Sequence, residues 1–186
     1  REAIGDYRRG ERAVWLARLQ EDPDLGAGIG EIAAVLAAED DDAAMTARLG
    51  IAFGKLFDGI GGPHTVAPYE SAYCGTGRLF QAPVSEMKQL IAETGLSIDS
   101  GFAEPADHLS IELTLAAHLL STGSPQADQM LWRLRNWVPA FCSSCIAGDA
   151  TGFFAGAARA LDGLIAAECR KLTTHSTHHA EEGNIK

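Results

Sequence analysis

Apolar residues recur three or four positions apart along most of this chain, and that spacing constrains the fold more than any other feature of the sequence. Met45, Leu49, Phe53, Leu56 and Ile60 form one such stripe, which places them on one face of an α-helix. No stretch sustains the alternation of apolar and polar residues that is typical of half-buried strands. The pattern therefore predicts an all-α fold.

Length and composition predict a single helical domain. The 186 residues are 46% hydrophobic and 22% charged, which is the composition of a globular protein and not of a disordered chain. A chain of this length buries about 70% of the surface that its unfolded form exposes, so it holds a core without disulfides or metals. We expect one helical bundle over residues 1–172 and a polar, disordered tail over residues 173–186.

Glycine and proline separate the predicted helices. The helices are expected over residues 10–20, 29–38, the stripe 45–60, 84–94, 105–121, 126–138, 139–147 and 151–172, with Gly95 and Gly123 as stops. The longest break is a Gly/Pro-rich loop over about residues 58–68. Such a loop permits hinge motion or exchange of an element between two copies, so a monomer and a domain-swapped homodimer are both compatible with it.

The net charge limits the partners of the chain. Its 15 basic and 25 acidic residues give a formal net charge of −10, the wrong sign for a nucleic-acid binder or a polybasic membrane anchor. The apolar-rich stretch 153–167 contains Arg159 and Asp162 and is too short to span a bilayer. We expect no nucleic acid and no stable membrane insertion. An acidic surface suits a positively charged partner, although it serves solubility equally well.

Four cysteines, at positions 74, 142, 145 and 169, place the chain in a reducing compartment. Three lie in apolar, helix-like stretches, where reduced thiols are the default for a chain of this size. No apolar leader segment lies near the first residue, so we expect a cytoplasmic protein. Cys142 and Cys145 form a C-x-x-C pair, the spacing of thiol redox sites. A small redox enzyme is therefore one alternative, although that motif belongs to a βαβ unit that this sequence does not predict.

The most informative segment surrounds Pro105, which favours a helix that begins there. On that helix His108 and Glu112 lie one turn apart, with Glu104 at the helix entry. Ionisable groups at a buried face need partners. A ladder of carboxylate, imidazole and carboxylate would favour the imidazolium form of His108 and leave acceptor oxygens for the donors of a ligand. The simpler alternative is an ordinary helix start, in which Glu104 and Asp107 only serve the helix dipole and His108 bonds Glu112.

A metal site is a further alternative, because His108, Glu112 and His118 occupy the same predicted helix. His118 lies six positions after Glu112, on the wrong side of the helix for shared coordination. No Glu-x-x-His pair supports a di-iron site in a helical bundle. We expect neither a metal ion nor another cofactor.

Aromatic residues flank the Gly/Pro-rich loop. Leu56 and Phe57 precede it at a helix end, and Tyr69, Glu70 and Tyr73 follow it. The two tyrosines are one helical turn apart, so two aromatic rings with polar tips share a face. Core aromatics next to a flexible connection are the simpler interpretation of the same pattern.

Four short motifs stand out in order along the chain. They are Leu56-Phe-Asp-Gly-Ile-Gly-Gly62, Ala67-Pro-Tyr-Glu-Ser-Ala-Tyr73, Glu104-Pro-Ala-Asp-His108 with Glu112-Leu113, and Trp137-Val-Pro-Ala-Phe141. Together they resemble the TorD/DmsD family of cytoplasmic chaperones for molybdenum-cofactor oxidoreductases, over about residues 15–165. The Glu-Pro-x-Asp-His motif is the most specific. The chain departs from the family at Arg133-Leu-Arg-Asn-Trp137, where members often have His-Leu-x-x-Trp.

That resemblance implies an all-α chaperone that catalyses no reaction. Family members bind the twin-arginine leader and the body of a molybdoenzyme precursor, assist cofactor insertion and delay export until folding is complete. The resemblance implies a signal-peptide-binding surface made of Leu56, Phe57, Tyr69, Glu70, Glu104, Asp107, His108 and Glu112. An apolar groove beside carboxylates is what an apolar leader with two arginines requires.

Overall fold

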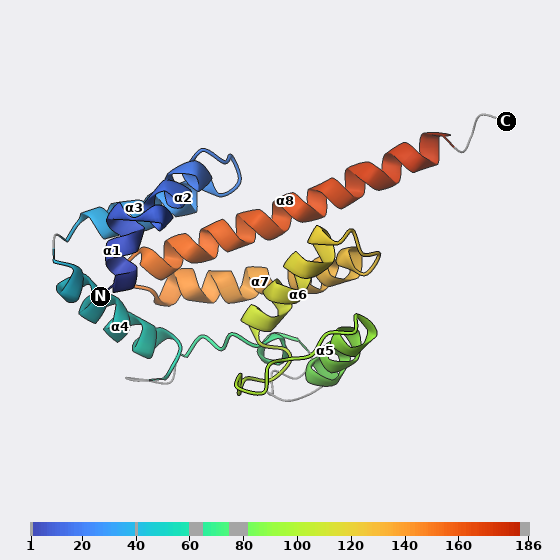
Figure 1. Cartoon of the computed structure of the whole chain (residues 1–186), viewed down its shortest axis with the longest axis horizontal. Helices are drawn as coiled ribbons and strands as arrows, with labels where there is room; N and C mark the ends of the chain where they lie inside the picture. Colours follow the sequence, from blue (N-terminus) through green and yellow to red (C-terminus); the bar gives the residue numbers. More distant parts are fainter. Residues whose placement is uncertain (1, 40, 60–64, 75–81, 183–186) are drawn as a thin grey trace. The chain divides into compact units, whose positions relative to one another are not determined.

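The computed structural model describes residues 2–39, 41–59, 65–74 and 82–182, with side chains from residue 3 to residue 172. Over these residues the chain forms helices, turns and loops, and it contains no strand. The prediction of an all-α fold is confirmed (Figure 1). No helix in the described part of the chain combines the length and the apolar character that crossing a membrane requires.

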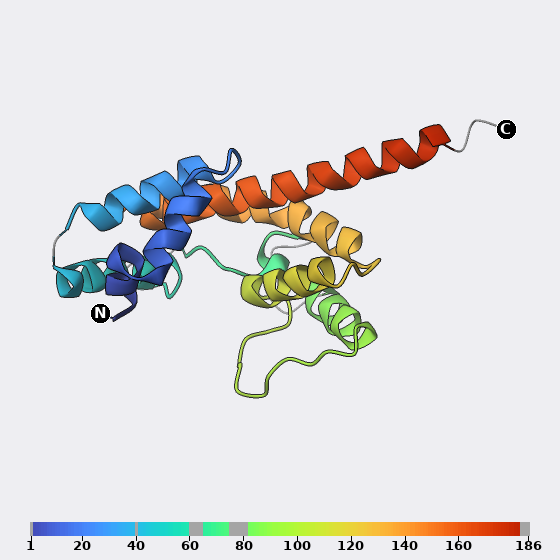
Figure 2. The same ribbon diagram turned by 45° about the horizontal axis from the view of Figure 1, so that its top comes forward.

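The helices follow one another in the order shown in Figures 1 and 2. They are α1 (Glu2–Arg9), α2 (Glu11–Gln20), α3 (Gly26–Ala37), α4 (Asp42–Leu56), the 3-10 helix η1 (Glu70–Ala72), α5 (Ala82–Glu93), α6 (Leu109–Ser121), α7 (Ala127–Gly148) and α8 (Phe153–Glu182). Gly95 and Gly123, the predicted stops, have φ angles of 73° and 62°. Glycine adopts this left-handed conformation most easily, and both residues end a helix.

The helices gather into two compact units. Unit 1 consists of Arg1–Val66 and Ala140–Ala167, and unit 2 of Ala67–Pro139 and Glu168–Lys186. Unit 1 therefore holds α1 to α4, and unit 2 holds η1, α5 and α6. α7 and α8 each contribute one part to each unit. The helical domain expected over residues 1–172 is thus made of two units that share two helices.

Unit 1 has a small apolar core, and α1 packs against α2, α3 and α4 around it. The buried residues of this core are Leu16, Ile29, Ile32, Leu36, Met45, Leu49 and Ala160. A charge cluster joins α1 to the start of α4, where Asp42 forms ion pairs with Arg8 and Arg9. The hydrogen bond from Arg9 is the largest reason why the pKa of Asp42 is lowered.

α3 and the unit 1 part of α8 approach each other closely because glycines lie at their contact. A Cβ atom on Gly28 would lie 2.4 Å from the carbonyl oxygen of Gly156 and 2.6 Å from the amide nitrogen of Ala160. A Cβ atom on Gly156 would lie 2.7 Å from the carbonyl oxygen of Gly28. Backbone atoms cannot move aside as a side chain does, so a methyl group at either position forces the helices apart.

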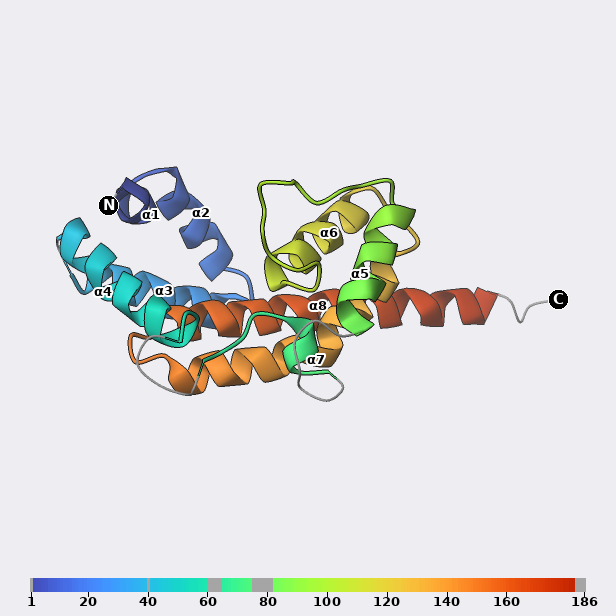
Figure 3. The same cartoon turned by 90° about the horizontal axis from the view of Figure 1, so that it is seen from below.

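Unit 2 packs around a second set of buried side chains. These include Met87, Leu90, Leu115, Leu119, Met130, Leu131, Leu134 and Trp137. α5 packs against η1, and α5 and α6 lie next to each other (Figure 3). The α8 part of the unit reaches α7, since the Sγ atom of Cys169 donates to the carbonyl oxygen of Leu131 at 3.7 Å.

The start of α6 differs from the sequence prediction. The helix begins at Leu109 with His108 as its N-cap, and not at Pro105. Residues before it form a turn, in which the His108 amide donates to the Pro105 carbonyl at 3.0 Å. The backbone of Asp107 to Leu109 is also bonded to residues 68–70, and these bonds hold it outside the helix.

The last two helices are longer than the sequence predicts. α7 continues through Pro139, so the two helices expected over 126–138 and 139–147 are one. Proline lacks an amide hydrogen, but its φ angle is that of a helix, and a long helix tolerates the loss of one bond. α8 continues past Leu172 to Glu182, because the sequence contains no glycine or proline between Phe153 and Glu182 except Gly156 and Gly163.

The structure adds detail at two further segments, α1 and the Gly/Pro-rich loop. α1 precedes the first predicted helix; its Ile4 and Tyr7 pack against the unit 1 core, a stripe too short to predict a helix. In the Gly/Pro-rich loop, Gly59 has a φ angle of 71°, and the Val66 amide donates to the Leu56 carbonyl at 2.8 Å. Residues 60–64 of this predicted hinge lie outside the described residues.

The glycine contact between α3 and α8 gives a prediction for stability. Gly28→Ala should lower the free energy of unfolding by about 1–3 kcal/mol, because the added methyl group overpacks the contact. The matched control is Gly50→Ala in α4, where a Cβ atom would meet nothing within 4 Å. This control should raise stability by up to ~1 kcal/mol, since alanine favours a helix over glycine. Urea unfolding followed by circular dichroism measures both; equal stability of the two variants would contradict the close approach.

Candidate functional site

Two segments far apart in sequence are joined by backbone bonds at the start of α6. The Glu70 amide donates to the Asp107 carbonyl at 3.0 Å, and the Leu109 amide donates to the Pro68 carbonyl at 2.9 Å. Tyr69 and His108 thereby form an isolated antiparallel bridge. This pairing brings the Pro-Tyr-Glu-Ser motif directly beside the Glu-Pro-x-Asp-His motif, so six of the eight predicted site residues gather in unit 2.

Asp107 is buried beneath this pairing. Its side chain is only 1% exposed, and its Oδ2 atom accepts a hydrogen bond from the Ser71 amide at 3.1 Å. Among the described residues, Asp107 Oδ1 and the Ser71 hydroxyl have no hydrogen-bond partner. Asp107 therefore fixes the backbone of η1, and it is not a side chain that solvent reaches.

His108 caps α6 with its side chain. Its Nδ1 atom accepts from the Ser110 amide at 3.2 Å and lies 2.8 Å from the Ser110 hydroxyl. An accepting Nδ1 carries no proton, so the neutral ring holds its proton on Nε2. Burial lowers the pKa of His108 below its ordinary 6.5, against the opposing charges of Glu104 and Asp107. The ring is therefore neutral at neutral pH.

Glu104 is the exposed carboxylate of the group. Its Oε2 atom accepts from the Tyr69 hydroxyl at 2.6 Å. Burial and the charge of Glu104 raise the pKa of Tyr69 to about 12, so the phenol remains a donor. The Tyr69 ring meets the His108 ring edge to face at a centroid distance of 5.1 Å, and Phe102 meets the same histidine at 5.9 Å.

The ladder of Glu104, His108 and Glu112 is wrong, and so is the bond between His108 and Glu112 that the simpler alternative contained. Glu104 binds Tyr69, His108 binds Ser110, and Glu112 points into the core, where it is 0% exposed. The physical reason is the later start of α6. With Glu104 outside the helix and His108 at its N-cap, the one-turn spacing that the sequence suggested does not apply to these residues.

Glu112 belongs instead to a buried charge network with Glu70 and Arg133. Trp137 donates through its indole Nε1 to Glu112 Oε2 at 3.0 Å. Arg133 forms an ion pair with Glu70, donates to Glu86 at 2.9 Å and lies 4.0 Å from Glu112 Oε1. The network joins η1, α5, α6 and α7, so one arginine lies near carboxyl groups from three other elements.

The two buried glutamates of this network share one proton. Burial and the charge of Glu70 raise the pKa of Glu112 from 4.5 to about 9. Burial also raises the pKa of Glu70, but the charge of Arg133 opposes that shift. Two carboxylates this close cannot both ionise without a large cost. At neutral pH the proton therefore resides on Glu112, beside the ion pair of Glu70 and Arg133.

Leu56 and Phe57 belong to unit 1, where Leu56 ends α4 and Phe57 is its C-cap. Leu56 is 4% exposed. The Phe57 ring packs against Phe53, Phe141 and Phe154 at centroid distances of 5.0, 6.4 and 5.7 Å. The aromatic residues before the Gly/Pro-rich loop thus belong to one unit, and the motif residues after it belong to the other.

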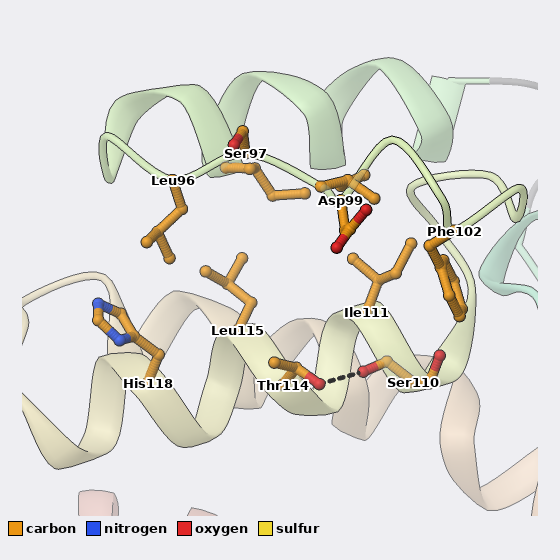
Figure 4. Close-up of a pocket in the computed structure, with 11 residues that line it drawn as sticks. Leu96, Ser97, Asp99, Phe102, Ser110, Ile111, Thr114, Leu115 and His118 are labelled. Atoms are coloured by element: carbon orange, nitrogen blue, oxygen red, sulfur yellow. Dashed lines mark hydrogen bonds between the residues drawn. The ribbon is translucent and has the colours of Figure 1, made fainter.

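An apolar pocket of about 400 Å³ opens between α6 and the segment that links it to α5 (Figure 4). The pocket, which we call the α6 pocket, is lined by Ile91, Leu96, Ser97, Ile98, Asp99, Phe102, Ser110, Ile111, Thr114, Leu115 and His118. Leu115 and Ile111 point from α6 toward Leu96 and the linking segment. Leu96 and Phe102 are 40% and 42% exposed, so the walls of the pocket are apolar and reach solvent.

Sequence reasoning missed two residues of this region, Arg133 and Phe102, as site residues. Arg133 was noted only as a departure from a family pattern, yet Met130, Leu134 and Trp137 on the same face of α7 are buried. An arginine between such neighbours requires carboxylate partners, and this signal was available. Phe102 precedes Glu104 by two positions, but nothing in a loop sequence indicates that it faces α6.

Comparisons with known proteins identify the relatives of this chain. Residues 19–143 match the family model for the nitrate reductase delta subunit. The chaperone protein TorD of Escherichia coli is 32% identical over 183 residues, which cover 90% of this chain and 84% of the relative. TorD of Salmonella arizonae is 29% identical over 173 residues, which cover 88% and 79%.

A solved structure shows the same fold. The crystal structure of a redox enzyme maturation protein from Archaeoglobus fulgidus has a TM-score of 0.53 and 25% identity to this chain. The match covers 82% of this chain and 91% of that protein. This chain belongs to the TorD chaperone family. The relatives are named as chaperones and as a maturation protein, and not as enzymes.

The thiols of this TorD-family chain are in a state that opposes redox chemistry. Cys142 and Cys145 are buried in α7, and burial raises the pKa of each thiol to about 12. The thiolate is the nucleophile in disulfide exchange, and at neutral pH neither thiol forms it. Within the described part of the chain, no group of three His, Cys, Asp or Glu side chains is placed to hold a metal ion.

The His108 cap predicts how the stability of this TorD-family protein depends on pH. The pKa of His108 in the folded state lies below the unfolded 6.5, so the unfolded chain takes up the proton first. The contribution of the neutral His108 side chain to the free energy of unfolding is complete above pH 6.5, and it is lost as pH falls through the folded pKa. His108→Asn keeps a good cap that does not titrate.

Thermal unfolding of both proteins across this range measures the effect. The wild type should lose stability relative to His108→Asn below pH 6.5. At neutral pH, His108→Ala should cost about 1 kcal/mol, because the cap is removed. Parallel pH profiles for wild type and the Asn variant would show that the imidazole is not the cap.

The buried proton predicts the opposite trend for Glu112. Its folded pKa of about 9 exceeds the unfolded 4.5, so the folded chain holds the proton more tightly. The contribution of Glu112 is greatest below pH 4.5 and declines as pH rises toward 9. Glu112→Gln replaces the neutral acid by a neutral amide of the same shape, which keeps an acceptor for Trp137 and a donor for Glu70.

We expect Glu112→Gln to match the wild type near pH 5 and to exceed its stability at pH 8 by a few kcal/mol, because at that pH the folding wild type must take up a proton that the amide does not need. Glu112→Ala should instead lose about 2–4 kcal/mol, because it removes the Trp137 acceptor and leaves a cavity. Urea unfolding at both pH values measures these differences. A Gln variant that is less stable at pH 8 would show that Glu112 is ionised.

Proposed function

We propose that this TorD-family chaperone binds the twin-arginine leader and the body of a molybdoenzyme precursor, assists insertion of its cofactor and delays its export until folding is complete. Family membership supports the chaperone role. The resemblance of the four motifs to the TorD/DmsD family is the basis for proposing a twin-arginine leader and a molybdoenzyme precursor as the partner. Among the predicted site residues in unit 2, we assign Glu104 the contact with the arginines of the leader. The buried residues hold the Glu104 side chain and its neighbours in position.

The observation that supports leader binding most directly is the exposed Glu104 carboxylate held by Tyr69. A carboxylate has acceptor capacity beyond one hydrogen bond, and an arginine side chain can bind it in a bidentate manner. Tyr69 and His108 provide aromatic surface beside it. Asp107, Glu70 and Glu112 are buried, so we assign them the role of positioning this surface.

Unit 1 offers a different kind of contact. Phe53, next to Phe57, is 47% exposed, and its ring lies 6.1 Å from that of Phe154. An exposed aromatic edge of this kind suits an apolar segment of the precursor body. Phe57 therefore remains a proposed contact, and Leu56, which is buried, supports the aromatic cluster from below.

Magnitudes decide which part of a leader provides the affinity. An exposed ion pair contributes only about 0.2–1 kcal/mol, and the Debye length of about 8 Å at physiological salt weakens longer-range attraction. Each fully buried apolar side chain contributes about 1.5–3 kcal/mol before ordering costs. The arginines therefore give specificity, and the apolar residues of the leader give most of the affinity.

The test is binding of synthetic twin-arginine leaders from the molybdenum-cofactor oxidoreductases of the source genome, measured by fluorescence anisotropy. At least one leader should bind, and Glu104→Gln should weaken it about two- to five-fold, as expected for an exposed ion pair. Replacing both leader arginines by glutamine should remove the difference between Glu104→Gln and wild type.

The matched control is Glu93→Gln, an exposed glutamate on α5 in the same unit, which should leave affinity unchanged. Added salt should weaken the complex only a few-fold, because apolar burial dominates. The proposal fails if no leader binds, or if leaders with and without their arginines bind equally well.

A further inference from the structure

The α6 pocket lies next to the surface formed by Glu104, Tyr69 and His108. Phe102 and Ser110 line the pocket, and both contact His108: the Phe102 ring at a centroid distance of 5.9 Å and the Ser110 hydroxyl at 2.8 Å from Nδ1. His108 in turn contacts Tyr69, which binds Glu104. One end of the pocket, which we call the Phe102 end, therefore meets the proposed arginine acceptor.

The other end of the pocket lies further along α6, toward its C-terminus. Figure 4 shows Leu96 and His118 at this end and Ser110 with Phe102 at the opposite one. We call it the Leu96 end. Ser110 and His118 are eight positions apart on α6, which corresponds to about 12 Å along the helix axis. The pocket is therefore long enough for about two turns of a bound helix or about four extended residues.

The charge around the pocket selects a cationic partner. Of the six acidic residues between positions 82 and 124, Glu86 pairs with Arg133, and Asp107 and Glu112 are buried. The other three, Glu93, Asp99 and Glu104, are exposed, and the same stretch contains a single lysine. Asp99 lies in the pocket wall, and its Oδ1 atom accepts from the Gly101 amide at 2.7 Å. No lysine or arginine is among the lining residues. An apolar segment attached to positive charges is therefore favoured over an acidic one.

We propose that the α6 pocket binds the apolar segment of the twin-arginine leader in one direction, with the arginines at Glu104, the first apolar residues at the Phe102 end and the later ones at the Leu96 end. This proposal rests on the proposed leader binding. The charged region of a signal peptide precedes its apolar region. With the arginines at Glu104, the chain that follows them enters the pocket past Phe102.

Apolar contacts in the pocket are tested first, with the leader that binds the wild type. Phe102→Ala and Leu96→Ala each remove an exposed apolar side chain, so neither threatens the core. Each should weaken binding by about tenfold, as expected for anchors of a small interface. The matched control is Leu120→Ala, which removes a leucine of α6 that is also 40% exposed but does not line the pocket. It should bind like the wild type.

The direction is tested by double-mutant cycles between pocket and leader. Alanine at the first apolar residue of the leader should couple to Phe102→Ala, and alanine at a residue about seven positions later should couple to Leu96→Ala. A benzophenone amino acid placed at the same two leader positions should cross-link to peptides containing residue 102 and residue 96, respectively.

The outcomes separate this inference from the proposed function. If the leader binds the wild type but both pocket variants bind it equally well, the pocket is not its site, while leader binding stands. If the couplings are exchanged between the two ends, the direction is wrong. If no leader binds the wild type, the proposed function and this inference fall together. Large losses in both pocket variants with the expected couplings support the inference.

Discussion

The pairing of residues 68–70 with residues 107–109 is the interaction on which the candidate site depends. Its backbone bonds hold Asp107 out of α6 and leave His108 at the N-cap. The same bonds place Tyr69 where its hydroxyl reaches Glu104. They also orient η1 so that Glu70 faces Arg133 across unit 2. Asp107 stabilises the pairing from below by accepting the Ser71 amide.

Charge in the buried part of this site is balanced by a single cation. Arg133 stands where the resembling chaperones often carry a histidine. Arginine remains charged at every pH at which the protein folds, so its ion pair with Glu70 does not depend on pH as that of an imidazole would. The remaining carboxyl, Glu112, avoids a second buried negative charge by keeping its proton. Two different solutions to the cost of buried charge thus lie within one network.

The sequence predicted the helical class and most helix positions, because these depend on local spacing. The apolar stripe of α4 and the stops at Gly95 and Gly123 follow from patterns of a few residues, whereas the family resemblance alone implied that Tyr69 and Glu104 belong to one surface. Where the prediction failed, contacts distant in sequence decided the outcome. Pro105 favours a helix start locally, but the pairing with residues 68–70 is worth more than one additional turn. Phe102 acquires its place only when the linking segment folds over α6.

The path of the chain through the two units has a consequence for its covalent integrity. The backbone passes from one unit to the other after Val66, Pro139 and Ala167, so neither unit is a continuous piece of polypeptide. Cleavage after Gly59 would leave α1 to α4 attached to the remainder only through noncovalent contacts, such as the packing of Gly28 on Gly156 and the ion pair of Glu31 with Arg159. If this four-helix fragment dissociated, it could bind the Ala140–Ala167 part of unit 1 in another copy of the chain. Because unit 1 is made of two separate stretches of chain, the order of the helices allows two fragments to reassemble by complementation.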